Sequence, residues 1–209
     1  MDGDSYTPQA TITLIAHWIE HQYIIEFYGN GATSGNMEPT EPIGYDYNKK
    51  LPKNNFLKTG YHFVAWNTIA DSSGDSYIDE SYVKNLSEIN GNVVKFYAQW
   101  EPNRYIIEFE PNGGSSISGE KFSQVHIYDS ELKLLKNDYF RDGYTFIGWA
   151  IHADAVEPDF EDEESIINLV TGNTTKLYAV WRVHTYTISF NGNGFTTGEM
   201  TEVLNATYD

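Results

Sequence analysis

Apolar and polar residues alternate in short runs along this chain, and the runs recur at a nearly constant spacing. An alternating run occupies residues 23–27 (YIIEF), returns at 105–109 (YIIEF) and appears again at 186–190 (YTISF). An Asn-Gly pair begins three residues after the end of each run. Alternation with a period of two residues is typical of a half-buried strand, and Asn-Gly favours a tight turn because both residues accept positive φ. The pattern predicts one strand and one turn, repeated three times.

Two further motifs repeat in the same order. GYHFVAW at 60–66 matches GYTFIGW at 143–149, and KFYAQW at 95–100 matches KLYAVW at 176–181. The first motif begins at a glycine and predicts a strand, and the second predicts a closing strand with aromatic and small residues on one face. With a further strand returning after the Asn-Gly turn, each unit is expected to hold four strands.

The repeats divide the chain into four segments. The closing motif also ends near residue 18 (LIAHW), so we expect residues 1–21 to be the tail, or last strand, of a preceding unit. Residues 22–101 and 102–182 are then complete units, and 183–209 form the first hairpin of a truncated third unit. A period of about 80 residues is near the smallest size that folds alone, which predicts a monomeric array of small modules.

One short helix is also expected in each unit. Asp79 or Ser81 would cap residues 82–89, in which valine, leucine and isoleucine fall three apart on one face. In the second unit the acidic residues 162–164 precede Ile166 and would complement the dipole at a helix start. The expected fold class is therefore α+β, mostly β, with a four-stranded sheet covered by one helix.

Composition narrows the classes of function. The chain has 30 acidic and 13 basic residues, a formal charge of −17, and no cysteine. This charge excludes nucleic acid as a partner, because binding phosphates requires a clustered Lys/Arg surface. The absence of cysteine removes disulfides, thiolate metal sites and a cysteine nucleophile. The apolar runs are too short for a transmembrane helix and the acidic start lacks a signal-peptide pattern, so we expect no direct membrane insertion in this segment.

Residues 17–21 (HWIEH) match the His-x-x-Glu-His pattern of some zinc peptidases. That chemistry needs a helix, which brings the two imidazoles to one metal ion. The matching residues of the complete units, 99–103 and 180–184, fall where a strand runs into a linker, and Pro102 does not suit a helix interior. We therefore expect these histidines to bind no zinc.

An acidic loop is a weak candidate for calcium. Asp71, Asp75 and Asp79 recur every four residues around Gly74. Calcium takes six to eight oxygen ligands, and such a loop supplies several, but the acids do not alternate as they do in an EF-hand. Solvated turns and helix-start charges are the favoured interpretation, and no cofactor is expected.

Aromatic residues that do not recur between the units are candidates for exposed contact with a sugar or a protein partner. The binding candidates are Tyr77, Phe122 and Phe160, and Tyr6 and Phe56 belong to the same unshared set. Motifs for a serine nucleophile, a phosphate loop or a dinucleotide site do not occur in the sequence, and we expect no catalytic residues and no enzyme.

The three motifs together resemble the Listeria–Bacteroides repeat, the family of the B repeat of internalin B. The resemblance is carried by residues 105–113, 143–149 and 177–181 and by the equivalent stretches of the first unit. It implies tandem β-grasp modules, similar to ubiquitin or SUMO, in secreted or wall-attached bacterial proteins. It transfers no catalytic residue.

The resemblance implies a non-catalytic extracellular module of a bacterial cell-surface protein that acts as a spacer or stalk in adhesion or host interaction. The alternative is a binding module that recognises a glycan or a host or bacterial surface protein through aromatic and acidic loops. Between the units, Pro102 is expected to stiffen one linker, and residues 182–184, which lack proline, to form a looser one.

Overall fold

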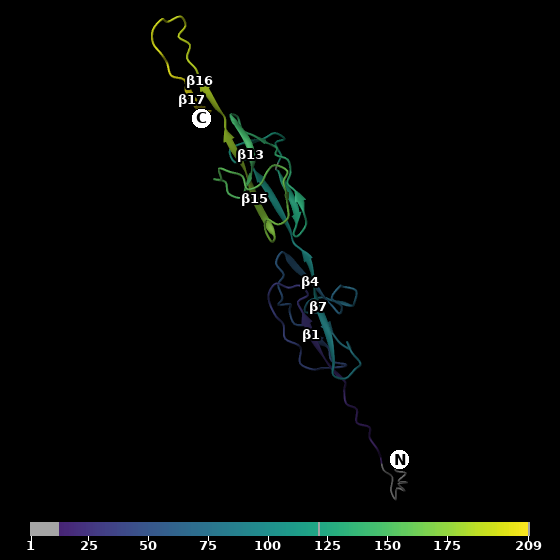
Figure 1. Cartoon of the computed structure of the whole chain (residues 1–209). Coiled ribbons are helices and arrows are strands. Elements are labelled where there is room, and N and C mark those ends of the chain that lie inside the picture. The colour runs from purple at the N-terminus through teal and green to yellow at the C-terminus, as the bar shows by residue number, and fades with distance from the viewer. Residues whose placement is uncertain (1–12, 121, 209) are drawn as a thin grey trace. The chain divides into compact units, whose positions relative to one another are not determined.

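The computed structural model describes residues 13–120 and 122–208, and it divides the chain into two compact units. The first unit comprises Met1–Phe56 and Val64–Gln99, and the second comprises Leu57–Phe63 and Trp100–Asp209. Throughout the described residues every regular element is a strand, and none is a helix long and apolar enough to cross a membrane. The strands, several of which are labelled in Figure 1, are β1 (Gln22–Tyr28), β2 (Ile43–Gly44), β3 (Lys49–Lys50), β4 (Tyr61–Asn67), β5 (Ser76–Tyr77), β6 (Tyr82–Val83), β7 (Asn92–Pro102), β8 (Arg104–Glu110), β9 (Ser115–Ser116), β10 (Ser123–Ile127), β11 (Leu132–Lys133), β12 (Tyr139–Phe140), β13 (Tyr144–Ala150), β14 (Ser165–Ile166), β15 (Asn173–Val183), β16 (Thr185–Ile188) and β17 (Val203–Thr207).

The main sheet of the first unit has the strand order β2-β1-β7-β4-β5. Its centre is a parallel pair in which β1 and β7 run side by side from Tyr23↔Asn92 to Tyr28↔Tyr97. The short strand β2 pairs with β1 in antiparallel orientation. The first and last long strands of the unit are therefore direct neighbours.

The second unit repeats this arrangement in a sheet of order β10-β8-β15-β13. Strands β8 and β15 are parallel, from Tyr105↔Asn173 to Glu110↔Tyr178, and the outer strands β10 and β13 are antiparallel to their neighbours. A separate antiparallel hairpin is formed by β16 and β17. The predicted long strands of the two complete units and their alternation are thus confirmed, whereas β16 (Thr185–Ile188) is exposed along its whole length.

Alternate residues of the parallel pair build an aromatic core in each unit. Tyr23, Ile25 and Phe27 are buried along β1, and the matching three residues of β8 are buried in the same way. The tryptophan of each GYxFxxW motif lies at the centre, and both Trp66 and Trp149 have no exposed surface. The Trp66 ring centre is 4.9 Å from that of Phe27, and Trp149 has a comparable contact with its own β8 phenylalanine. Each unit therefore has its own centre of packing.

The predicted helix over residues 82–89 is wrong. Val83 lies instead in β6 and pairs with Lys49 of β3, and its side chain is 3% exposed. Positive φ angles at Glu80 and Asn85, both 56°, break any helix on either side of this strand. The isoleucine that ends the expected apolar stripe, Ile89, is 69% exposed, so the stripe does not lie on one buried face.

The matching helix of the second unit is absent for the same reason. Ile166 lies in β14, which pairs with β11, and Glu163 has a φ of 58°. The acidic residues expected at a helix start bind elsewhere: Asp162 accepts the backbone N–H of Asn137 at 2.8 Å, and Glu163 forms an ion pair with Lys133 at 3.1 Å. The α+β class, with a β-grasp module whose sheet carries a helix, is corrected to an all-β fold.

In both complete units the Asn-Gly turn is fixed by the asparagine side chain as well as by its backbone. Asn30 and Gly31 both have positive φ, 46° and 88°, and the turn closes through Ala32 N–H to the carbonyl of Gly29 at 3.1 Å. The side-chain amide of Asn30 also donates to the carbonyl of Ala98 in β7 at 2.9 Å. The turn after the first strand is thereby tied to the last strand.

In the second unit Asn112 repeats these contacts. Its φ is 47°, and its amide donates to the carbonyls of Ala153 and Ala179, at 2.8 and 3.0 Å. The pair of bonds explains why asparagine stands at this position, since glycine would satisfy the φ angle but not the two carbonyls.

We expect Asn112→Ala to lower the free energy of unfolding of the second unit by about 2–3 kcal/mol. Two hydrogen bonds of about 1 kcal/mol each are lost, and a left-handed alanine adds roughly 1 kcal/mol. Urea denaturation followed by tryptophan fluorescence measures the change. Asn112→Gly relieves the backbone strain but lacks the two hydrogen bonds, so it should recover only the strain part of the lost free energy of unfolding. Asn48→Ala, a change on the exposed surface, should alter the free energy of unfolding by less than about 0.5 kcal/mol. Equal stability of all four proteins would contradict this role.

Candidate functional site

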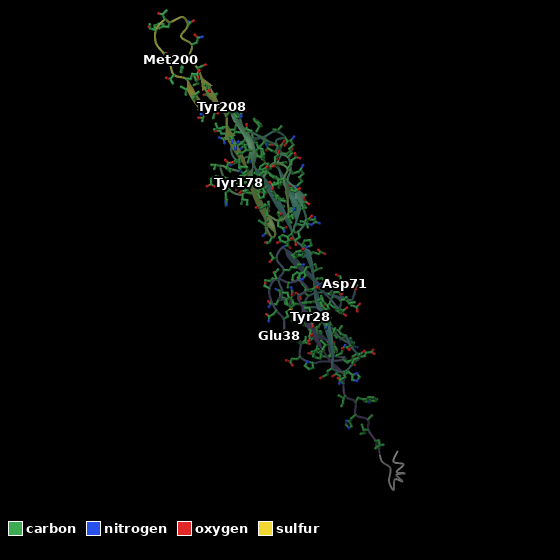
Figure 2. The ribbon with its side chains drawn as sticks, in the orientation of Figure 1. Tyr28, Glu38, Asp71, Tyr178, Met200 and Tyr208 are labelled. Carbon is green, nitrogen blue, oxygen red and sulfur yellow. The ribbon has the colours of Figure 1, made fainter. Side chains whose placement is uncertain are left out.

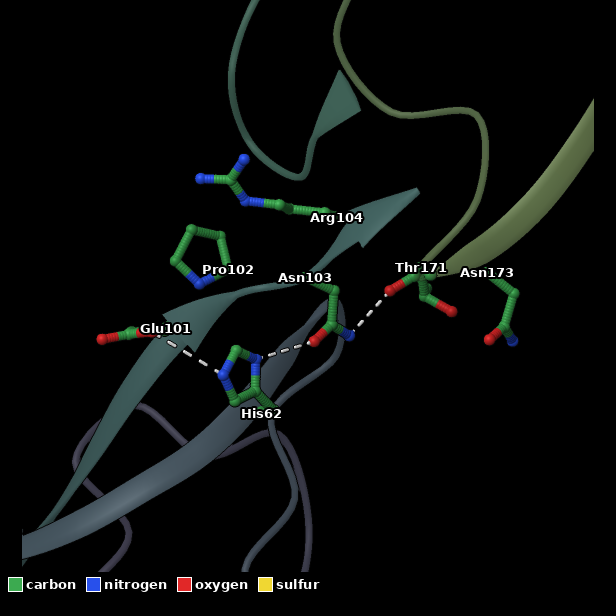
Figure 3. Close-up of a pocket in the computed structure, with 8 residues that line it drawn as sticks. His62, Glu101, Pro102, Asn103, Arg104, Thr171 and Asn173 are labelled. Carbon is green, nitrogen blue, oxygen red and sulfur yellow. Dashed lines mark hydrogen bonds and ion pairs between the residues drawn. The ribbon is translucent and has the colours of Figure 1, made fainter. Parts of the chain in front are cut away.

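A polar hollow of about 510 Å³ lies in the second unit (Figure 3). It forms where β7 ends and β8 begins, with one residue, Asn103, between the two strands. The hollow is lined by His62, Glu101, Pro102, Asn103, Arg104, Thr171, Gly172 and Asn173. Most of these side chains are polar, and the geometry of the hollow follows from Asn103.

Asn103 is held by four hydrogen bonds. Its backbone N–H donates to the carbonyl of Gly60 at 2.8 Å, and its carbonyl accepts the N–H of Tyr128 at 2.9 Å. Its side-chain amide donates to the carbonyl of Thr171 at 2.8 Å, and its side-chain oxygen lies 3.1 Å from Nδ1 of His62 (Figure 3). Because the amide nitrogen of Asn103 is the donor to Thr171, its oxygen faces His62, and the imidazole Nδ1 is the donor there.

His62 has a carboxylate on its other side. Its Nε2 lies 3.7 Å from Glu101, and both side chains are more than half exposed. This contact is an ion pair only when the ring is protonated, and exposed pairs of this kind contribute at most about 1 kcal/mol. At the matching position further along the chain, His184 replaces the asparagine and Thr145 replaces the histidine, with Thr145 Oγ1 and His184 Nε2 at 2.9 Å. The contact is kept although the two side chains have changed, which favours a structural role.

Within the hollow, the side chain of His62 contacts those of Glu101 and Asn103, and Asn103 also binds a backbone carbonyl. The residues that line the hollow include neither a serine nor a cysteine that could act as a nucleophile. Across the residues that the structure describes, no group of three His, Asp or Glu side chains could hold a metal ion. The arrangement suits a joint between two strands that is fixed by hydrogen bonds.

The calcium candidates lie in a loop that is organised by a buried asparagine. The amide of Asn67, which is fully buried, accepts the N–H groups of Ile69 and Gly74 and donates to the Gly74 carbonyl at 3.0 Å. Asp71, labelled in Figure 2, accepts from Ser73, whose hydrogen bonds lower the pKa of the Asp71 carboxyl. These hydrogen bonds within the protein thus fix the conformation of the loop.

The other two candidates make separate contacts. Asp79 accepts the backbone N–H of Asn54 at 2.9 Å, and the indole of Trp66 lies 3.4 Å from the same carboxylate. Asp75 contacts Thr68 through its backbone, with its N–H 3.0 Å from Thr68 Oγ1. In the second unit Asp162 accepts a backbone N–H in the same way as Asp79 does in the first unit. The acidic residue at this position therefore has the same structural role in both units.

The His-x-x-Glu-His residues do not form a helix. Residues 13–21 carry no regular structure, and His17 is exposed. The Nδ1 atom of His21 lies 2.8 Å from the carbonyl of Glu88, and the side chain of Glu20 faces the N–H of Asp46 at 3.4 Å. The structure does not bring these three side chains together in the arrangement of a zinc peptidase.

Two of the aromatic binding candidates occupy one and the same position in the two units. Tyr77 pairs across the strands with Trp66, and Phe160 forms the equivalent bridge to Trp149. The Tyr77 ring stacks on Phe96 at 4.9 Å, and burial raises the pKa of its hydroxyl. The recurrence was not predicted from the sequence because this position holds tyrosine in the first unit and phenylalanine in the second.

The remaining aromatic candidates lie against the same cores. The ring centre of Phe122 is 4.6 Å from that of Phe109, and Phe56 packs at 6.2 Å from Trp66. Tyr6 lies outside the described residues.

The sequence did not predict the buried histidine His126. His126 is 1% exposed, and its Nδ1 atom is hydrogen-bonded to the hydroxyl of Tyr105, which also accepts the N–H of Leu169 at 3.1 Å. Its Nε2 atom is buried without a hydrogen-bond partner. Burial lowers the pKa of the imidazole, and the backbone of Ser130 acts weakly in the opposite direction. The matching residue of the first unit is Ile43, also buried, so this group distinguishes the two cores.

Comparison with known proteins identifies the repeat. The Listeria-Bacteroides repeat domain matches residues 23–99 and again residues 105–180. Two proteins of Evansella cellulosilytica are similar over most of this chain. One, named "Putative Gly-rich membrane protein", is 33% identical over 205 residues, which cover 92% of this chain and 22% of that protein. The other, named "Putative membrane protein", is 28% identical over 201 residues, covering 95% and 27%. The chain spans about a quarter of the length of these relatives.

We expect the second unit to lose stability as the pH falls below about 6.5, the ordinary pKa of histidine. Because the folded-state pKa of His126 is lowered, the unfolded chain binds the proton more readily, and the free energy of unfolding falls by at most about 1.4 kcal/mol per pH unit until the folded pKa is reached.

Urea denaturation at a series of pH values measures this slope. His126→Ile, which introduces the residue of the first unit, should remove this part of the slope. The five other histidines stay unchanged in both proteins and provide the common background. An identical pH dependence in the two proteins would exclude His126 as its source.

Proposed function

This chain belongs to the Listeria–Bacteroides repeat family of bacterial surface proteins, and we propose that it serves there as a non-catalytic, extracellular spacer that bears tension. A spacer must keep its modules folded while its ends are pulled apart. The single observation that carries the proposal is the parallel pairing of the first and last long strands in each unit.

Parallel pairing determines how a pulling force reaches the hydrogen bonds. The chain enters at the start of β1 and leaves at the end of β7, and these points lie at opposite ends of the paired strands because the strands run in the same direction. A pull on the two ends therefore slides one strand along the other. The bonds along the six registered residue pairs are loaded together, and none is the first to open.

Both units support this pair from their own residues. The buried face of each pair packs on its own tryptophan, and the asparagine of each turn binds a carbonyl of its own closing strand. The carboxylates Asp79 and Asp162 likewise hold equivalent backbone N–H groups in the two units. Recurrence of the same polar contacts supports a scaffold role for these residues in preference to a binding or catalytic one.

The charge of the chain is consistent with this role. A formal charge of −17 gives repulsion between like-charged modules and counteracts their non-specific association. A spacer at a cell surface benefits from both effects.

A binding module is the second candidate, and one contact in the first unit favours it. Tyr28, labelled in Figure 2, stacks on Tyr97 with ring centres 5.1 Å apart and planes at 24°. The matching pair in the second unit is Glu110 and Tyr178, so the stacked rings are particular to the first unit. Paired aromatic faces on a sheet suit a sugar or a protein partner. On a glycan array, saturable binding that is lost in Tyr28→Ala would favour this candidate over a spacer alone.

The spacer proposal is tested by single-molecule pulling in two directions. Because the chain has no cysteine, attachment points can be placed at will. With Gln22→Cys and Glu101→Cys, the force slides β1 along β7. With Gln22→Cys and Val93→Cys, both attachments lie at the same end of the strands, and the force opens the bonds one at a time.

We expect the first geometry to need at least about twice the force of the second, because rupture under load is governed by the unfolding barrier. The first unit, which lies between the attachment points, should lengthen by an amount on the order of 25 nm when it opens. Equal forces in the two geometries would contradict the proposal.

A further inference from the structure

Two turns in the second unit bind in the same way to another segment of the unit. We call the residues that bind such a turn its acceptor site. In the first, the turn at residues 58–61 closes through Tyr61 N–H to the carbonyl of Lys58 at 3.0 Å. The carbonyl of its Gly60 accepts the N–H of Asn103 at 2.8 Å. The hydroxyl of Tyr61 donates to Asp129 at 2.8 Å, and the Tyr61 ring lies edge-on to Tyr128 at 5.9 Å. We call such a turn, with its glycine and tyrosine, a Gly-Tyr turn.

Glycine is required in this turn. Gly60 has a φ of 76°, and a side-chain carbon there would lie 2.2 Å from the ring of Tyr128. The second Gly-Tyr turn repeats the geometry at Gly143, where the φ is 74° and an added carbon would lie 2.0 Å from the ring of Tyr208. The carbonyl of Gly143 accepts the N–H of His184 at 2.8 Å. Both acceptor sites thus recognise a glycine by close contact with a tyrosine ring.

The first unit contains the residues of a third acceptor site. Tyr45 N–H donates to the carbonyl of His21 at 2.9 Å, which matches the bond from Tyr128 to Asn103 at 2.9 Å and that from Tyr208 to His184 at 3.2 Å. These residues therefore already have the backbone geometry of the two occupied sites.

The carboxylate of the third site is also in place. Asn85 donates to one oxygen of Asp46 at 3.3 Å, as Asn168 donates to one oxygen of Asp129 at 2.8 Å. In the second unit the other oxygen of Asp129 accepts a hydrogen bond from the hydroxyl of Tyr61. Among the described residues, no hydroxyl donates to the corresponding oxygen of Asp46, and no ring packs on Tyr45.

This site opens into a hollow of about 710 Å³ that is rich in acidic side chains. The hollow is lined by Trp18, Ile19, Glu20, His21, Tyr45, Asp46 and Glu88. Both Gly-Tyr turns carry a basic residue over the tyrosine: Lys58 Nζ lies 3.9 Å from the ring centre of Tyr61, and Arg141 lies 3.7 Å from that of Tyr144. The charges of the turn and of the hollow are therefore complementary.

We infer that His21, Tyr45 and Asp46 form a docking site for the Gly-Tyr turn of another copy of this repeat. The glycine carbonyl accepts the N–H of His21, the glycine itself packs on the Tyr45 ring, and the tyrosine hydroxyl donates to Asp46. The occupant is a further copy because both Gly-Tyr turns of this chain are engaged in the second unit. The inference goes beyond the load-bearing role and does not rest on it.

A fusion of the chain with itself tests the inference. Residues 1–181 joined to residues 19–209 place Gly143 and Tyr144 of the first part at the same distance along the chain from His21 of the second part as they have from His184 in the single chain. We expect the His21 amide of the second part to exchange with solvent at least about tenfold more slowly than in the single chain, because it gains a hydrogen bond. The Asn103 amide, bonded in both proteins, is the internal reference.

A double-mutant cycle tests the hydroxyl contact. Tyr144→Phe in the first part and Asp46→Asn in the second part should show a coupling of roughly threefold or more in the unfolding equilibrium. The matched cycle is Tyr61→Phe with Asp129→Asn in the single chain, which already has this contact. Asp46→Asn alone in the single chain should show no such loss.

Two results together would overturn the inference: a His21 amide that exchanges equally fast in both proteins, and changes at Tyr144 and Asp46 that simply add. Neither depends on the force at which a unit opens, so this outcome is separable from failure of the spacer proposal.

Discussion

The parallel contact between the first and last long strands is the constraint on which the remainder of each unit depends. It brings residues about 70 positions apart, such as Tyr23 and Asn92, into register. Because residues in register on neighbouring strands point to the same face of a sheet, the alternate apolar residues of the two strands share one side, where Ile25 and Phe96 are both fully buried. The tryptophan and the short strand pairs then cover that side. Loss of this contact would separate the two strands on which the core packs.

The local parts of this fold were readable in the sequence. Alternation in residues 23–27 is a direct consequence of one buried face, and Asn-Gly pairs fit a turn that needs two positive φ angles. The helix over 82–89 was predicted wrongly because a spacing of three apolar residues in so short a stretch does not separate a helix from an irregular segment. Val83 is buried by its pairing with Lys49, a partner more than 30 residues away that local spacing does not reveal.

Polar roles in the candidate site were harder to read for a related reason. Asp79 lies in an acidic stretch, but its function as an acceptor for Asn54 depends on a loop that approaches from 25 residues earlier. His126 has no neighbouring charge or motif in the sequence, and only the fold shows that it is buried beside Tyr105. Comparison of the two repeats held the one useful signal, since a histidine stands where the first unit has Ile43.

The asparagine turns also bear on how such a protein ages. Asparagine followed by glycine is the pair most prone to deamidation, in which the glycine nitrogen attacks the side-chain amide. In Asn30 and Asn112 that amide is bonded to two carbonyl oxygens and is held in one orientation. Conversion to aspartate would replace a shared donor by a negative charge facing both carbonyls. The hydrogen bonds of the folded turn therefore restrain the movement of the amide that deamidation requires.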